Sequence, residues 1–204
     1  MGSVDTIQTP NYQYKIGFSL DEFNQATGGN LSQNEIEKIL LEKRFEYKIV
    51  VVREALEETI PKCMNAIYKN PSSMRLDAPN AFSCSSLVSF IYTQAGVWMP
   101  SLSIDKYVFG KQISFDDLQF GDLIFSNSGI GAIRTETVEY KPGTKVPEGV
   151  DHVALYLGNK EILHATKKYG KVVKEDLKNL ENISMVVGFR RVANIDEKRF
   201  VVTV

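Results

Sequence analysis

The chain has 204 residues, of which 43% are hydrophobic, and its 24 Lys and Arg residues nearly balance its 25 Asp and Glu residues. A chain of this size and composition buries enough apolar surface to fold without a metal or a disulfide scaffold, and it is too apolar for a disordered protein. Its formal net charge of -1 lacks the basic excess that draws proteins to nucleic acid, and no apolar run reaches the roughly 20 residues of a membrane span.

The N-terminus has no basic segment followed by an apolar one, so it shows no export signal. We therefore expect a cytoplasmic protein as the sequence stands, or an exported one if a native leader has been removed. Gly2 and Ser3 are typical of a cloning remnant, so residues 1–4 carry no expectation about the fold.

Two short helices and a strand are predicted within the first 52 residues. Ser19 and Ser32 each precede a glutamate by three residues, which is the spacing of a capping box at a helix N-terminus. Residues 45–52 alternate and are rich in β-branched side chains, which predicts a strand. We expect residues 1–52 to form a small helical, winged-helix-like module. The stretch 18–52 resembles a module of the phenylalanyl-tRNA synthetase beta chain and contains no catalytic residue.

Residues 53–204 are predicted to form a second domain of the α+β class. A helix is expected over 53–69, punctuated by Pro61, which can start a helix but does not suit a helix interior. A second helix over 85–95 ends at Gly96. Five short strands follow, at 122–126, 153–157, 161–165, 171–174 and 185–192. A helix followed by consecutive short strands is typical of an α+β fold with an antiparallel sheet.

Cys84 lies at the predicted start of the helix over 85–95. Ser83 is a favourable N-cap, and a helix N-terminus carries about half a positive charge, which favours the thiolate over the thiol. A nearby imidazole would complete the activation of a nucleophile. The alternative is a buried free cysteine, which is the commoner fate of a lone cysteine and the one we expect for Cys63.

The only two histidines of the chain, His152 and His164, fall on consecutive predicted strands. They share the same strand parity, and a hairpin centred near Gly158 would bring them to one face, within about one position of each other. One imidazole could take the thiol proton while the other orients it; the alternative is two unrelated polar strand residues. One cysteine with two histidines is too few ligands for a typical structural zinc site but enough for a thiol active site, and the two cysteines cannot build a four-cysteine zinc site. Thiol chemistry requires no metal or organic cofactor, so we expect neither.

Five segments around these candidates follow one another along the chain: 82–88 (FSCSSLV), 95–100 (AGVWMP), 120–125 (FGDLIF), 151–158 (DHVALYLG) and 162–165 (ILHA). In this order they resemble the successive motifs of the NlpC/p60 cysteine peptidases, over about residues 60–192. The resemblance implies a papain-like fold, in which the helix of the nucleophile packs on a small, curled antiparallel sheet. It also implies Cys84 as the nucleophile, His152 as the general base and His164 as the orienting third residue.

Such enzymes typically cut bacterial cell-wall stem peptides, most often between D-glutamate and a diamino acid, and we expect a peptide substrate of this class. The family usually has Asp before the cysteine and Gly two residues after it, where this chain has Ser83 and Ser86. We expect both serines, together with Ser85, to line the substrate site. Tyr68 is a further candidate, because it alone could match a family tyrosine that precedes the cysteine, although the Trp-Gly-Gly that accompanies it is absent.

Other interpretations of the sequence remain open. The domain could be a catalytically silent module that binds cell-wall peptide, or a cysteine acyltransferase or amidase effector of the same fold. The N-terminal module could carry the main function as an adaptor. The stretch 126–150, rich in Gly and Pro, could cover the site as a lid, or form a surface excursion with a small hairpin near 135–140. The sequence does not determine the oligomeric state.

Overall fold

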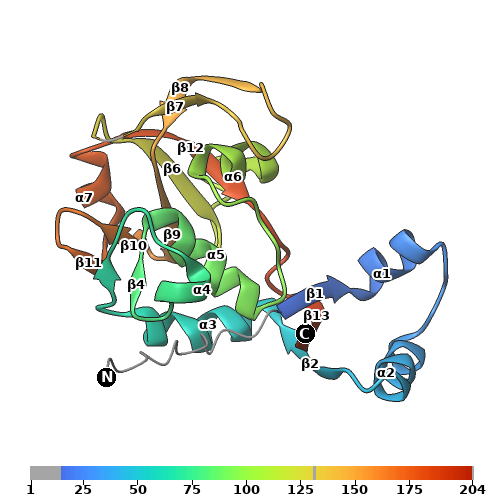
Figure 1. Cartoon of the computed structure of the whole chain (residues 1–204). Helices are drawn as coiled ribbons and strands as arrows, with labels where there is room; N and C mark the ends of the chain where they lie inside the picture. Colours follow the sequence, from blue (N-terminus) through green and yellow to red (C-terminus); the bar gives the residue numbers. More distant parts are fainter. Residues whose placement is uncertain (1–14, 131, 204) are drawn as a thin grey trace, which may run out of the picture.

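The computed structural model describes residues 15–130 and 132–203 and has an α+β architecture (Figure 1). The first 14 residues of the predicted module and one residue of the 126–150 stretch lie outside the described residues. In chain order the elements are β1 (Lys15–Ser19), α1 (Leu20–Thr27), α2 (Gln33–Glu42), β2 (Glu46–Val51), α3 (Val52–Cys63), β3 (Ile67–Tyr68), α4 (Met74–Asp77), β4 (Ala81–Phe82), α5 (Cys84–Gln94), α6 (Ser103–Phe109), β5 (Lys111–Ile113), β6 (Leu123–Asn127), β7 (Arg134–Glu136), β8 (Lys145–Val150), β9 (His152–Gly158), β10 (Glu161–Thr166), β11 (Lys171–Asp176), α7 (Leu177–Glu181), β12 (Met185–Arg191) and β13 (Lys198–Thr203).

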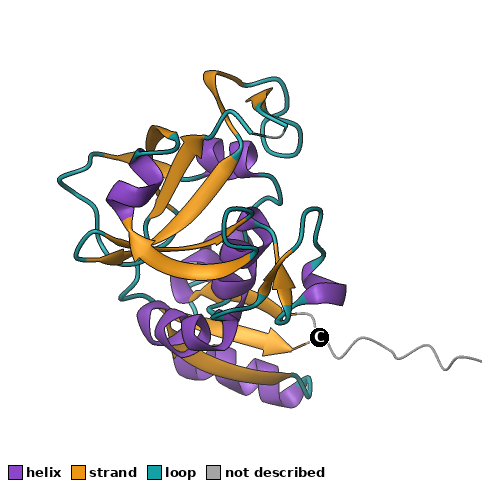
Figure 2. Cartoon of the chain, turned by 90° about the vertical axis from the view of Figure 1, so that its left-hand side faces the viewer, coloured by secondary structure: helices purple, strands orange, loops and turns teal. Residues whose placement is uncertain are grey.

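The main sheet has eight strands in the order β4-β3-β11-β10-β9-β6-β12-β5, and all its pairs are antiparallel except β3 with β4. Its strands curve strongly (Figure 2), and α5 packs against β9 and β10. Successive residues of β9 alternate between two cores: Val153 and Leu155 pack with α5, whereas Ala154 and Tyr156 pack with α7. The predicted fold class, in which the helix that begins at Cys84 packs on a curled sheet, is confirmed.

The predicted helix over 53–69 is wrong in its last six residues. Helix α3 ends at Cys63, and Tyr68, expected near a helix end, belongs to the short strand β3. Pro61 stands inside the last turn of α3. The proline is tolerated there because it removes one helical hydrogen bond near an end where the chain leaves the helix three residues later.

The first module contains the two predicted helices and the predicted strand. Ser19 and Ser32 each form a reciprocal capping box with the glutamate three residues on. A small core then forms where Ile36 and Leu40 of α2 meet Phe200 and its neighbours. This separate core explains why the module projects to one side of the main body (Figure 1).

The last strand of the chain completes the sheet of this first module. Strand β13 lies between β1 and β2, and Phe200 is paired with Phe18 on one side and with Ile49 on the other (Figure 1). The predicted division into 1–52 and 53–204 stays a prediction. The strand pairing departs from it at one point, because the final strand of the second part belongs to the sheet of the first.

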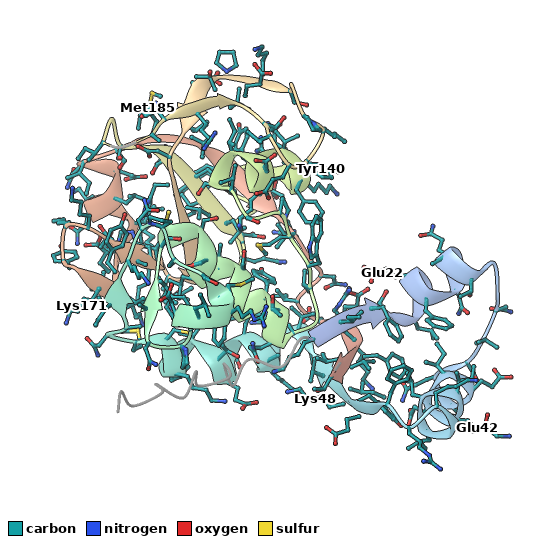
Figure 3. The ribbon with its side chains drawn as sticks, viewed as in Figure 1. Glu22, Glu42, Lys48, Tyr140, Lys171 and Met185 are labelled. Atoms are coloured by element: carbon teal, nitrogen blue, oxygen red, sulfur yellow. The ribbon has the colours of Figure 1, made fainter. Side chains whose placement is uncertain are left out.

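The module meets the main body at the C-terminal end of α5. A Cβ atom on Gly17 would lie 2.1 Å from the Cα of Gly96, so only a residue without a side chain allows this approach. Arg199, which is 5% exposed, donates to the carbonyl of Gly96 and, at 2.6 Å, to the carboxylate of Glu22. Glu22 lies in the first turn of α1 (Figure 3). The junction is therefore close-packed rather than a loose linker.

This pairing predicts how truncated chains behave. A chain of residues 52–204 keeps β13 but loses both of its neighbouring strands, so the apolar Phe200 and Val202 become exposed on an unpaired strand. We expect it to aggregate more than a chain of residues 52–197, as measured by size-exclusion chromatography. Soluble, monomeric 52–204 with the melting temperature of the full chain would contradict this expectation.

The stretch 126–150 forms a hairpin, in which β7 pairs with β8. The strand near 135–140 ends at Glu136, because a turn at 137–144 follows it. One carboxylate oxygen of the buried Asp105 in α6 accepts hydrogen bonds from the backbone N–H groups of Val138, Glu139 and Tyr140, at 2.7–3.0 Å. The tip of the hairpin is thus fastened to α6.

None of the helices in the described part of the chain combines the length and the apolar character needed to cross a membrane.

Candidate active site

Cys84 is the first residue of α5, as predicted, and Ser83 is its N-cap. The Ser83 hydroxyl accepts a hydrogen bond from the backbone N–H of Ser86 at 3.2 Å. Cys84 is a free thiol with 8% of its surface exposed, and Cys63 is a free thiol with none. The sulfur of Cys84 lies 3.8 Å from the carbonyl oxygen of Asp151 and 3.9 Å from the hydroxyl of Ser103. The helix thereby aims the thiol at the start of β9.

The two histidines lie beside each other on one face of the sheet. His152 begins β9 and His164 lies on β10, and the pairing of Leu163 with Leu155 places the histidines diagonally across the two strands. His152 Nε2 is 2.9 Å from His164 Nδ1, and the rings meet edge to face. The prediction that the two histidines share one face is confirmed, but they are offset by two residues where we expected about one.

Cys84 and His152 favour each other's charged forms. Burial raises the pKa of the Cys84 thiol, but the charge of His152 and a hydrogen bond to its ring outweigh burial, so that this pKa is lowered. Burial likewise lowers the pKa of His152, and the Cys84 thiolate outweighs it, so that this pKa is raised. The arrangement supports a thiolate–imidazolium pair.

His164 has the opposite character. Burial, with the charges of His152 and Lys168, lowers the pKa of His164 to about 3, so its ring is neutral at physiological pH. A neutral ring has one nitrogen that accepts, and a protonated His152 donates from both nitrogens. His152 Nε2–H therefore donates to His164 Nδ1, which leaves His152 Nδ1 for the thiol.

The other predicted site residues surround the thiol, but their hydroxyls are engaged within the protein. Ser86 bonds to Ser83 and, at 2.7 Å, to Ser72. Ser85 donates to the carbonyl of Ser101. Tyr68 packs against the core cluster that contains Cys84, and burial raises its pKa. Their role in substrate binding stays a prediction.

Sequence reasoning missed a buried lysine near the thiol. Lys106 of α6 is 0% exposed, and its ammonium donates to the Ser85 hydroxyl and to the carbonyls of Pro100 and Ser101 at 2.6–2.7 Å. Burial lowers the pKa of Lys106 to about 7, although the negative charge of the Cys84 thiolate acts to raise it. Lys106 thus ties the loop before α6 to the first turn of α5. A lone lysine in a short helix gives no sequence signal for this position.

Among residues 15–130 and 132–203, no three His, Cys, Asp or Glu side chains gather in a way that could hold a metal ion. The groups gathered at this site are a thiol, two imidazoles and the N–H groups of a helix terminus.

Comparison with known proteins shows which family has this sequence and fold. The model of the NlpC/P60 family matches residues 72–191, which is more than half of the chain and includes all three candidate residues. The chain belongs to the NlpC/P60 family. Among solved structures, an NlpC/P60 family protein from Bacillus cereus ATCC 10987 has a TM-score of 0.54 at 23% identity, over 70% of this chain and 40% of that one. The P60 domain of an antigen from M. avium subspecies paratuberculosis has a TM-score of 0.51 at 26% identity, over 71% of this chain and 99% of that domain.

Curated relatives in this family include hydrolases. The chain is 36% identical over 91 residues to the peptidoglycan endopeptidase RipB of Mycobacterium tuberculosis, a match that spans 45% of this chain and 30% of RipB. It is 27% identical over 112 residues to the gamma-DL-glutamyl hydrolase of Bacillus subtilis, over 55% of this chain and 24% of that enzyme. The chain thus matches about a third or less of the length of these two relatives.

Proposed function

We propose that this protein is a thiol hydrolase that cleaves amide bonds in bacterial cell-wall stem peptides, with the bond between D-glutamate and a diamino acid as the specific candidate. The observation that carries the proposal is the geometry of the site: the Cys84 sulfur, at the start of α5, lies 3.8 Å from the carbonyl oxygen of the residue before His152, and His152 Nε2 lies 2.9 Å from His164 Nδ1. The lowered pKa of Cys84 and the raised pKa of His152 agree with this arrangement. Relatives named for peptidoglycan and for gamma-DL-glutamyl hydrolysis support the substrate class.

In this mechanism the Cys84 thiolate attacks the carbonyl carbon of the scissile bond and forms a tetrahedral intermediate. The backbone N–H of Cys84, in the first turn of α5 where N–H groups have no helical partner, stabilises the oxyanion. His152 then protonates the leaving amine, and the acyl-enzyme remains. In the second half His152 takes a proton from water, the hydroxide attacks the acyl carbon, and the acyl group leaves as the acid, which restores the Cys84 thiolate beside protonated His152.

The competing possibilities differ in what happens to Cys84. A silent peptide-binding module has no need for a thiol with a lowered pKa, so the coupling of Cys84 with His152 favours catalysis. An acyltransferase or amidase of the same fold would use the same thiol but would pass the acyl group to an amine or act on a side-chain amide. The products separate these alternatives.

The test is mass analysis of peptidoglycan digested with the wild-type protein, with Cys84→Ala and with Cys63→Ala. We expect wild type and Cys63→Ala to release peptides cut after D-glutamate, and Cys84→Ala to lose this activity by a factor of 10³ or more, about the scale on which nucleophile removal acts. Products with an added amine would indicate transfer instead. Equal digestion by Cys84→Ala and wild type would refute the proposal.

A further inference from the structure

A buried carboxylate stands behind the second histidine. Glu175 lies on β11, two residues beyond Val173, which pairs with His164, so the two side chains are diagonal neighbours on one face of adjacent strands. Glu175 Oε1 is 2.8 Å from His164 Nε2. Only 7% of the Glu175 side chain and 1% of the His164 side chain are exposed.

The ring nitrogen of His164 and the carboxylate oxygen of Glu175 are each other's available hydrogen-bond partner. Neither His164 Nε2 nor Glu175 Oε1 has a hydrogen-bond partner among the described residues, and the two atoms lie 2.8 Å apart. A buried polar atom that stays unpaired costs free energy, which favours a hydrogen bond between these two atoms. The second oxygen of Glu175 accepts a hydrogen bond from the Tyr169 hydroxyl at 3.1 Å, which holds the carboxylate in place.

We propose that Glu175 is a positioning residue that fixes the proton of His164 on Nε2, so that the thiol, the two histidines and this carboxylate act as a row of four. This inference deepens the proposed function and rests on it for its consequence in catalysis. None of the sequence motifs includes Glu175.

The reason lies in the two tautomers of a neutral imidazole. A carboxylate accepts and does not donate, so His164 satisfies it only by carrying its proton on Nε2. His164 Nδ1 is then an acceptor for His152 Nε2–H, across the observed 2.9 Å. The opposite tautomer would point the His164 proton at a nitrogen of His152 that also carries one. Glu175 therefore selects the tautomer in which His152 is held with Nδ1 toward Cys84.

The negative charge of Glu175 has a second consequence. It is among the groups that raise the pKa of His152, after the thiolate of Cys84 and the neighbouring Asp151. The imidazolium therefore persists to higher pH with Glu175 than without it. Removing the charge should lower the pKa of His152 and so lower the upper pH limit of the thiolate–imidazolium pair.

The direct test is ¹⁵N NMR of the full chain with labelled histidine, which is simple because the chain has two histidines. In the wild type we expect His164 as the Nε2–H tautomer. In Glu175→Gln the amide oxygen still accepts, so the tautomer should persist while the pKa of His152 falls. In Glu175→Ala the tautomer should become mixed. Glu161→Gln is the matched control, because Glu161 pairs with Lys174 across the same two strands without reaching His164.

Kinetics on a D-glutamyl–diaminopimelyl peptide supply the second readout. We expect Glu175→Ala to lower kcat roughly 10-fold with little change in KM, a fraction of the about 10²- to 10⁴-fold that acid–base catalysis supplies, and Glu175→Gln to lower it less. The upper limb of the pH profile should move to lower pH in both. A purely structural role for Glu175 would lower the melting temperature without moving that limb.

The two proposals fail separately. If the wild type cleaves no peptide, the proposed function falls, and the tautomer and the His152 pKa still decide the role of Glu175. If the wild type cleaves the peptide while Glu175→Gln and Glu175→Ala leave the tautomer and the His152 pKa unchanged, the role of Glu175 is refuted. Should Glu175→Ala not fold, the His152 pKa and the pH profile of Glu175→Gln carry the same decision.

Discussion

Replacing His152 by alanine is expected to lower kcat at least about 10³-fold, because the thiol then loses its proton acceptor and the leaving amine loses its acid. His164→Ala should lose less, roughly 10- to 100-fold, since His164 orients His152 and transfers no proton itself. His164→Asn and His164→Gln should recover part of that loss, because either amide can accept the hydrogen bond from His152 Nε2–H. Peptide hydrolysis by the four variants measures this order.

The same variants differ in how far they shift the pH dependence. The charge of His152 lowers the pKa of Cys84, so His152→Ala should move alkylation of Cys84 to higher pH. His164 is uncharged because its pKa is about 3, so His164→Ala should shift the pH dependence of Cys84 alkylation much less. Near wild-type rates in both His152→Ala and His164→Ala would disprove the thiol mechanism. If His164→Ala is the more damaged variant, with its melting temperature preserved, the roles of the two histidines are reversed.

The sequence predicted those elements that depend on contacts between residues close together in the chain. The capping boxes at Ser19 and Ser32 fix the starts of α1 and α2 within a few residues of chain, and both appear as expected. The alternation of β9 and β10 and the turn at Gly158 placed the two histidines on one face for the same reason. Such contacts depend on spacing within one hairpin, which the sequence displays.

Pairing between strands that are distant in the chain could not be predicted from these local patterns. Strand β13 lies between β1 and β2, more than 145 residues away along the chain, and nothing in its own alternation indicates which sheet it joins. The roles of Glu175 and Lys106 could not be predicted from the sequence for a related reason. Glu175 reaches His164 only through the register of β10 with β11, and Lys106 reaches the turn of Ser85 only through the packing of α6. Because a charged side chain is usually exposed, only the structure reveals that these two are buried.

The largest contrast is expected between the two thiols of the folded protein. Burial raises the pKa of Cys63 to about 12, whereas that of Cys84 lies below the ordinary value of 9.0. At pH 6 the thiolate fraction is therefore roughly 10⁻⁶ at Cys63 and above about 10⁻³ at Cys84, a ratio of at least about 10³. The lower nucleophilicity of a low-pKa thiolate, with a Brønsted slope of about 0.4–0.5, offsets at most half of this ratio on a logarithmic scale.

Iodoacetamide labelling near pH 6 with peptide mapping should therefore modify Cys84 and leave Cys63 untouched, the more so because Cys63 is 0% exposed. Denatured chains labelled at pH 8.5 supply the control, in which both sites should react alike because neither environment survives. Cys84→Ala should abolish the fast phase, and His152→Ala should slow it while leaving Cys63 inert. Labelling of Cys63 as fast as Cys84 in the folded chain would show that the helix terminus and His152 do not activate Cys84, and the assignment of the nucleophile would then be lost.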